Sequence, residues 1–135
     1  MKLWRGSSVS ELSGDSGGTA HGLGAYADAV GKDTLPALDR TMMAVAEWIR
    51  DTAGTFLGHV KMAVTTKERT MTLNLTDLGT GVEHHGSLID GERLDIRFMA
   101  AVLDVDHDEL AEKMRKELIS NGFKIKKSMN IVELR

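Results

Sequence analysis

The sequence predicts an α+β domain, a two-layer sandwich of about four mostly antiparallel strands with two helices on one face. Apolar residues recur every three or four positions in two segments and alternate with polar residues in several shorter ones. Glycine, asparagine and charged residues separate these segments. With 135 residues, 41% of them hydrophobic and 27% charged, the chain is long enough to bury the core of one globular domain.

The first helix is predicted to begin after residue 33. Asp33 or Thr34 can cap its start, Pro36 suits its first turn, and Gly54 suits its end. The apolar residues that share one face of this helix are Leu35, Leu38, Met42, Val45 and Ile49.

A hairpin is predicted next, with strands over about 55–65 and 69–76. In both strands apolar residues alternate with polar ones, which indicates one buried and one solvated face. A third strand, over about 93–103, is apolar enough to lie in the centre of the sheet.

The second helix follows the sequence Asp106-His107-Asp108-Glu109, which has the Asp-x-x-Glu form of a capping box. Leu110, Met114 and Leu118 form its apolar face, and Asn121-Gly122 ends it. A last strand is predicted over 123–134. Its Lys-Ile-Lys-Lys run is typical of an edge strand protected from aggregation, and a patch for a partner is the alternative interpretation.

Two segments lack a sustained apolar period. Residues 1–33 are rich in Gly and Ser and are interpreted as a flexible arm or loop, which leaves 34–135 as the single α+β domain. Residues 77–92 contain four glycines and the pair His84-His85, and are interpreted as a long loop.

Composition argues against several classes of protein. The net charge of −3 disfavours nucleic-acid binding, and the absence of cysteine excludes disulfides and thiolate metal sites. The sequence shows no signal peptide and no apolar run of membrane-spanning length, so we expect a soluble, cytoplasmic protein without a membrane partner.

Three glycine-rich strings imitate enzyme motifs without their required surroundings. Gly14-Asp15-Ser16-Gly17-Gly18 resembles a serine protease nucleophile string, but no histidine precedes it. Gly22-x-Gly24-x-x-Ala27 is not preceded by a predicted strand, and Gly31-Lys32-Asp33 lacks the Ser or Thr of a phosphate-binding loop. We identify no catalytic residues and no bound cofactor, and a non-enzymatic role is favoured.

The histidines suggest a metal site. Glu83, His84 and His85 lie in a glycine-rich segment that could wrap an ion, and His59 is predicted on the solvated face of the first hairpin strand. These four residues are candidate ligands for Zn, Ni or Co, because imidazole and carboxylate groups bind such ions without thiolates. The alternative interpretation is that they are ordinary solvated side chains.

One stretch resembles a known family. Gly58-His59-Val60-Lys61, the strands at 71–77 and 94–102, and Asp106-x-x-Glu109-Leu110 are similar to the C-terminal region of CobW-like GTPases, over about Leu35 to Leu118. The resemblance implies a detached accessory domain acting beside metallochaperone or cofactor-insertion GTPases, with His59 and Lys61 carried over. The chain lacks the family's GTPase domain, phosphate-binding loop and Cys-x-Cys-Cys motif.

Three functions therefore stand as hypotheses. The first is an accessory or assembly domain that binds a protein partner, with a divalent metal as a candidate ligand. The second is a small oligomeric, ligand-binding or enzymatic domain, a homodimer for example, whose pocket is closed by the 77–92 segment. The third is a structural or regulatory subunit without a ligand.

Overall fold

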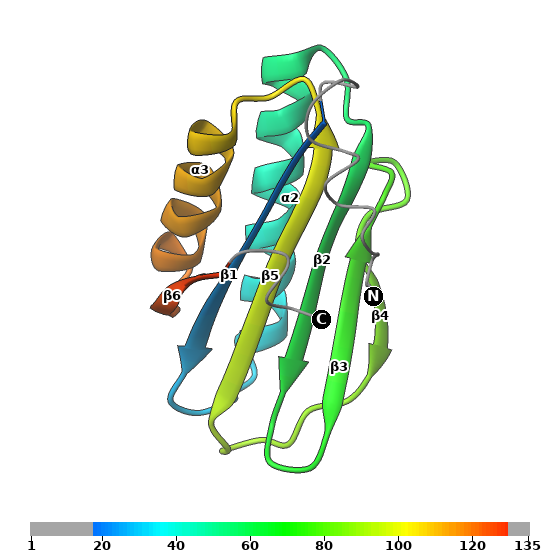
Figure 1. Cartoon of the computed structure of the whole chain (residues 1–135). Coiled ribbons are helices and arrows are strands. Elements are labelled where there is room, and N and C mark those ends of the chain that lie inside the picture. The colour runs from blue at the N-terminus through cyan, green and yellow to red at the C-terminus, as the bar shows by residue number, and fades with distance from the viewer. Residues whose placement is uncertain (1–17, 130–135) are drawn as a thin grey trace.

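The computed structural model describes residues 18–129. They form one six-stranded antiparallel sheet, in the order β4-β3-β2-β5-β1-β6, with two helices on one of its faces (Figure 1). The elements are β1 (Gly18–Ala27), α2 (Thr34–Ala53), β2 (Gly58–Thr65), β3 (Thr70–Leu75), β4 (Glu83–Gly86), β5 (Leu94–Leu103), α3 (His107–Ser120) and β6 (Lys124–Met129). The predicted α+β class is confirmed.

The connectivity contains a repeated βαβ unit. Without β3 and β4, the order β1-α2-β2-β5-α3-β6 is a split βαβ arrangement, in which β1 lies between β5 and β6. The β3–β4 hairpin is inserted between β2 and β5 and extends the sheet beyond β2. Helix α2 packs on the β2 and β3 half of the sheet, and α3 packs on β1 and β6.

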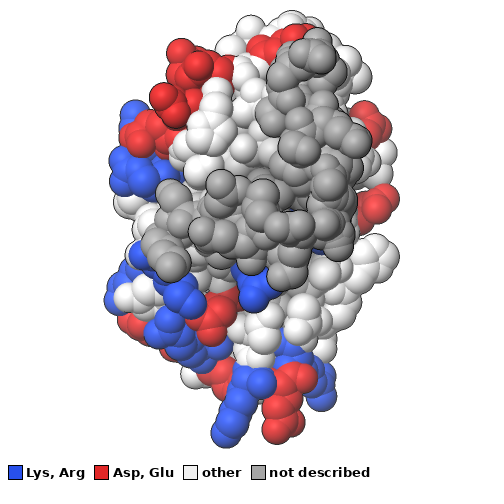
Figure 2. Space-filling view, viewed as in Figure 1, with Lys and Arg blue, Asp and Glu red and all other residues white. Residues whose placement is uncertain are grey.

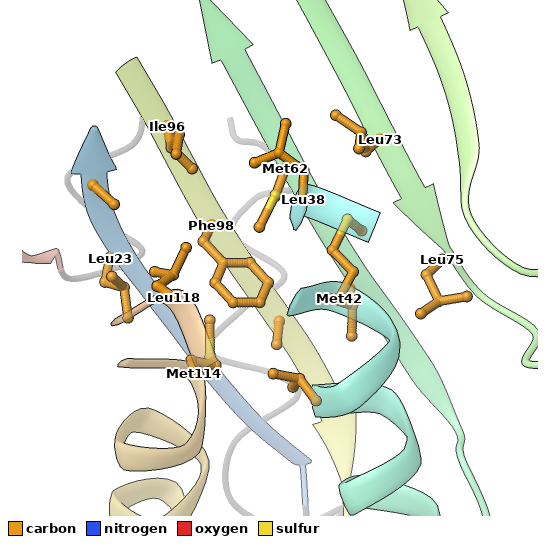
Figure 3. Close-up of a cluster of buried hydrophobic side chains, with 14 of the residues drawn as sticks. Leu23, Leu38, Met42, Met62, Leu73, Leu75, Ile96, Phe98, Met114 and Leu118 are labelled. Atoms are coloured by element: carbon orange, nitrogen blue, oxygen red, sulfur yellow. The ribbon is translucent and has the colours of Figure 1, made fainter. Parts of the chain in front are cut away.

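The core lies between the helices and the sheet (Figure 3). Phe98 of β5 is fully buried near its centre, with Met42 of α2 and Met114 of α3 among its neighbours. Buried residues alternate along β2, β3 and the first half of β5, whereas residues 98–102 of β5 are all apolar and buried, so each strand presents an apolar face to the helices. Methionine adapts its shape to irregular gaps, which suits a core with so few aromatic residues.

The prediction of an arm or loop was wrong for residues 18–27. We interpreted all of 1–33 as arm or loop, whereas Gly18–Ala27 forms β1, a strand paired on both sides. Its Thr19, His21, Leu23 and Ala25 alternate with small residues, and this period of two was hidden by the glycine content. Residues 1–17 lie outside the described part, so an arm there stays a prediction.

The 77–92 segment is also more ordered than predicted. Residues 83–86 form β4, which pairs with β3 from Met71 opposite Gly86 to Asn74 opposite Glu83. Together β1 and β4 raise the sheet from the expected four strands to six. The strand β6 lies at an edge of the sheet, as its lysines indicated.

The helix ends follow the predicted signals in most respects. Gly54 ends α2 with φ of 91°, and its N–H donates to the carbonyl of Arg50. Asp33 occupies the N-cap position but makes no side-chain capping bond. At α3, Asp106 Oδ2 accepts from the Glu109 N–H at 3.0 Å, which is the predicted cap.

Candidate functional site

The face of the sheet opposite the helices carries small residues at its centre. Strand alternation places Gly22 and Gly24 of β1 on this face, beside Met99 and Arg97 of β5. The next strand, β2, contributes Ala63, which pairs with Arg97 from the other side. We call this surface the outer face.

A depression of about 620 Å³ lies in the outer face and spans all the strands from β3 to β6. Gly24 and Ala63 are the residues paired with Arg97 on the two neighbouring strands. The surface is hollow beside Arg97 because these two residues have almost no side-chain volume. The lining residues are Gly24, Ala63, Thr65, Thr70, Asp95, Ile96, Arg97 and Lys126. Two hydroxyls and three charged groups therefore surround a hollow made by small residues.

The charges around the depression are mostly positive. Asp95 Oδ1 accepts a hydrogen bond from the Arg93 guanidinium at 3.3 Å and lies 3.5 Å from Lys126 Nζ. This carboxylate therefore forms ion pairs with two cations. The guanidinium of Arg93 also stacks 4.2 Å from the centre of the Tyr26 ring. Within residues 18–129, no carboxylate lies within ion-pair distance of Arg97.

The neighbouring pair of Lys124 and Asp28 continues this charged area along the sheet edge. Their side chains are 2.8 Å apart, and this hydrogen bond lowers the pKa of Asp28 and raises the pKa of Lys124. Figure 2 shows Lys and Arg side chains at the lower left of the view, with Asp and Glu side chains among them. Two of the three charged groups that line the depression, Arg97 and Lys126, are cations.

The predicted metal ligands lie on different sides of the sheet. Residues of a strand alternate between faces, so His84 lies on the helix side while Glu83 and His85 lie on the other. His84 Nε2 is 2.7 Å from Asp39 Oδ1 of α2, and His59 Nε2 is 3.1 Å from Asn74 Oδ1. In the described part of the chain, no three His, Asp or Glu side chains group to hold an ion.

The structure instead joins two histidines that sequence analysis did not connect. Nδ1 of His21 in β1 is 3.3 Å from Nε2 of His107, the first residue of α3. The rings meet edge to face, with centroids 5.1 Å apart. Nδ1 of His107 is in turn 3.2 Å from Asp108 Oδ1. No local pattern indicates this contact, because 86 positions separate the two histidines.

His21 is buried in an apolar setting. The residue is 9% exposed, and within the described part of the chain its Nε2 is buried without a hydrogen-bond partner. Burial lowers the pKa of His21 below its ordinary value, and the neighbouring His107 lowers it further. The ring is therefore held neutral at neutral pH.

The fold and this face define the chain as an α+β domain of the split βαβ type, with a depression on its sheet that Arg97, Lys126 and Asp95 help to line. Comparison with protein-family models, with characterised proteins and with solved structures finds no match to the chain. Across residues 18–129, none of the helices is long and apolar enough to cross a membrane.

Proposed function

We propose that this chain is a non-enzymatic accessory domain that binds an acidic segment of a protein partner in the depression of the outer face. The observation that carries the proposal is the position of Arg97 between Gly24 and Ala63, in a hollow of about 620 Å³. A guanidinium presents several N–H donors in a plane and binds a carboxylate through two parallel hydrogen bonds.

The chemistry of the depression suits binding better than catalysis. Its charged groups are Arg97, Lys126 and Asp95, and Asp95 is already engaged by two cations. The hydroxyls of Thr65 and Thr70 can add hydrogen bonds to a bound carboxylate or peptide group.

The charge balance favours a peptide over a nucleic acid. Asp95 lies inside the depression and Asp28 beside it, so a continuous phosphate backbone would meet carboxylates as well as cations. A peptide with separated acidic side chains can contact Arg97 and Lys126 and avoid both. The net charge of −3 for the whole chain agrees with this choice. The resemblance to the accessory region of CobW-like GTPases supports the same assembly role.

The test is a titration of ¹⁵N-labelled protein with a short peptide that carries four glutamates. We expect amide shifts to cluster at Gly24, Ala63 and Arg97, and binding to weaken as salt is raised. Arg97→Ala should weaken binding by about tenfold or more, because a hydrogen bond to a charged group contributes about 1.5–3 kcal/mol.

The matched control is Arg115→Ala, which removes an exposed arginine of α3, far from the depression in the chain's fold. This variant should bind the peptide as the unmodified chain does. Shifts scattered over both faces, equal losses in the two variants, or no binding at low salt would each contradict the proposal.

A further inference from the structure

The contact between His21 and His107 has the dimensions of a metal ligand pair. The facing nitrogens, Nδ1 of His21 and Nε2 of His107, are 3.3 Å apart. Two imidazole nitrogens bound to one tetrahedral Zn²⁺ at about 2.0–2.1 Å are held about 3.3–3.4 Å apart. The two rings therefore already have the separation that a shared ion requires.

We propose that His21 and His107 bind one divalent transition metal ion of the Zn²⁺ class between their facing nitrogens. The two rings come from β1 and α3, so the ion would join the sheet to the first turn of the helix. This site is separate from the outer-face depression, because His21 shares the helix-facing side of β1 with Leu23 and Ala25. It also differs from the ligands predicted at His59, Glu83, His84 and His85.

Asp108 prepares His107 for this role. Its Oδ1 is 3.2 Å from Nδ1 of His107, and a carboxylate in this place holds the proton of the ring on Nδ1. Nε2 of His107 is then left with a free electron pair that faces His21. Histidines that bind metals are commonly oriented by a carboxylate on the nitrogen that does not touch the ion.

The proton on His21 can be accounted for. With Nε2 of His107 as acceptor, Nδ1–H of His21 donates in the metal-free pair. Binding the ion moves this proton to Nε2 of His21, which is buried without a partner among the described residues, and frees Nδ1 for the metal. Both rings stay neutral, so neither the bound nor the metal-free pair requires an added charge on the rings.

The site is open on one side. The side chain of His107 is 54% exposed, so an ion can reach the pair from solvent without crossing the core. Two imidazoles leave two positions of a tetrahedral ion for water or for an external ligand. Such a site binds more weakly than a closed structural site, and we expect a micromolar dissociation constant.

The test is calorimetric titration of tag-free, chelator-treated protein with ZnCl₂, followed by the side-chain ¹⁵N signals of the histidines. We expect one equivalent of Zn²⁺, with shifts of Nδ1 in His21 and Nε2 in His107. His107→Gln should abolish the binding, and Asp108→Asn should weaken it by about tenfold. Mg²⁺ should produce no shift, because it prefers oxygen ligands.

The matched control is the double variant His84→Gln/His85→Gln, which removes the same number of imidazoles elsewhere. It should retain the full equivalent of Zn²⁺. The inference is overturned if a large molar excess of Zn²⁺ over the protein leaves the signals unchanged. It is also overturned if His107→Gln keeps the ion or if the double variant loses it. His107 is exposed, so its variant decides the question even if His21→Gln does not fold.

Discussion

His84 of β4 and Asp39 of α2 are 45 positions apart in the chain, yet His84 Nε2 lies 2.7 Å from Asp39 Oδ1. The bond connects the outermost strand of the sheet to the helix that packs on its neighbour. β4 has four exposed residues, and within residues 18–129 it pairs with β3 alone. The bond to Asp39 is therefore a contact that holds this edge against the body of the domain.

We predict that His84→Ala loosens β4 without unfolding the domain. Both side chains are about one-third exposed, so the loss in stability should be about 0.5–1 kcal/mol. Amide exchange at residues 83–86 should become faster, while exchange in β5 should stay unchanged. His85→Ala removes the neighbouring imidazole from the other face and should have little effect. Equal effects of the two substitutions would contradict the role of Asp39.

The stability of the metal-free protein should fall as the pH falls through about 6.5. The pKa of His21 is lowered in the folded state, so between the two pKa values the unfolded chain binds the proton and the folded chain does not. The stabilisation is therefore complete above the ordinary histidine pKa and decreases below it.

Urea denaturation at pH 7.5, 6.5 and 5.5 in the presence of a chelator would measure this decrease. Carboxylates also titrate over part of this range, so the comparison is with His21→Leu, which should show a smaller loss. His85→Gln serves as the control and should follow the unmodified chain. An identical pH dependence in His21→Leu would mean that His21 does not contribute.

Gly58 is predicted to be the least replaceable glycine at the start of a strand. Its φ is +142°, and a Cβ there would lie 2.7 Å from the Cα of Val102 in β5. Neither backbone can retreat without breaking the ladder, so Gly58→Ala should cost about 2–3 kcal/mol. Gly31→Ala is the control, because nothing lies within 4 Å of its added Cβ, and it should leave thermal unfolding nearly unchanged.

The capping bond of Asp106 should stabilise the start of α3. Asp106→Ala leaves the Glu109 N–H without its acceptor and should cost about 1 kcal/mol, measured by chemical denaturation. Asp106→Asn keeps an acceptor oxygen and should retain most of that stability. A similar loss in both variants would mean that the charge of Asp106, through the helix dipole, contributes more than the hydrogen bond.

The helices were predictable because their signals are local. The apolar spacing from Leu38 to Ile49, the stop at Gly54 and the cap at Asp106 all act within a few residues of one another. The strand β1 was missed because Gly18, Gly22 and Gly24 imitate a loop. Their conformational cost is offset by pairing with β5 and β6, which no local pattern reports.

The candidate site was predicted only in part. Lys126 was noted in a lysine run, but Arg97 carried no signal of its own, because a single charged residue within an apolar strand is common. The alternation of glycine and alanine through residues 18–24 could have indicated a smooth strand face. The depression forms because the strand register places Gly24 and Ala63 on either side of Arg97.

The sequence by itself determined the α+β class, the two helices and the lysine-bearing edge strand β6, since these depend on periodicity and on residues close in the chain. Only the tertiary structure decided which histidines lie on the same side of the sheet and which come into contact. It separated His84 from His85 by strand alternation, and it brought His21 to His107 across 86 positions. Both outcomes follow from strand order and helix packing, which depend on burying the whole apolar surface at once.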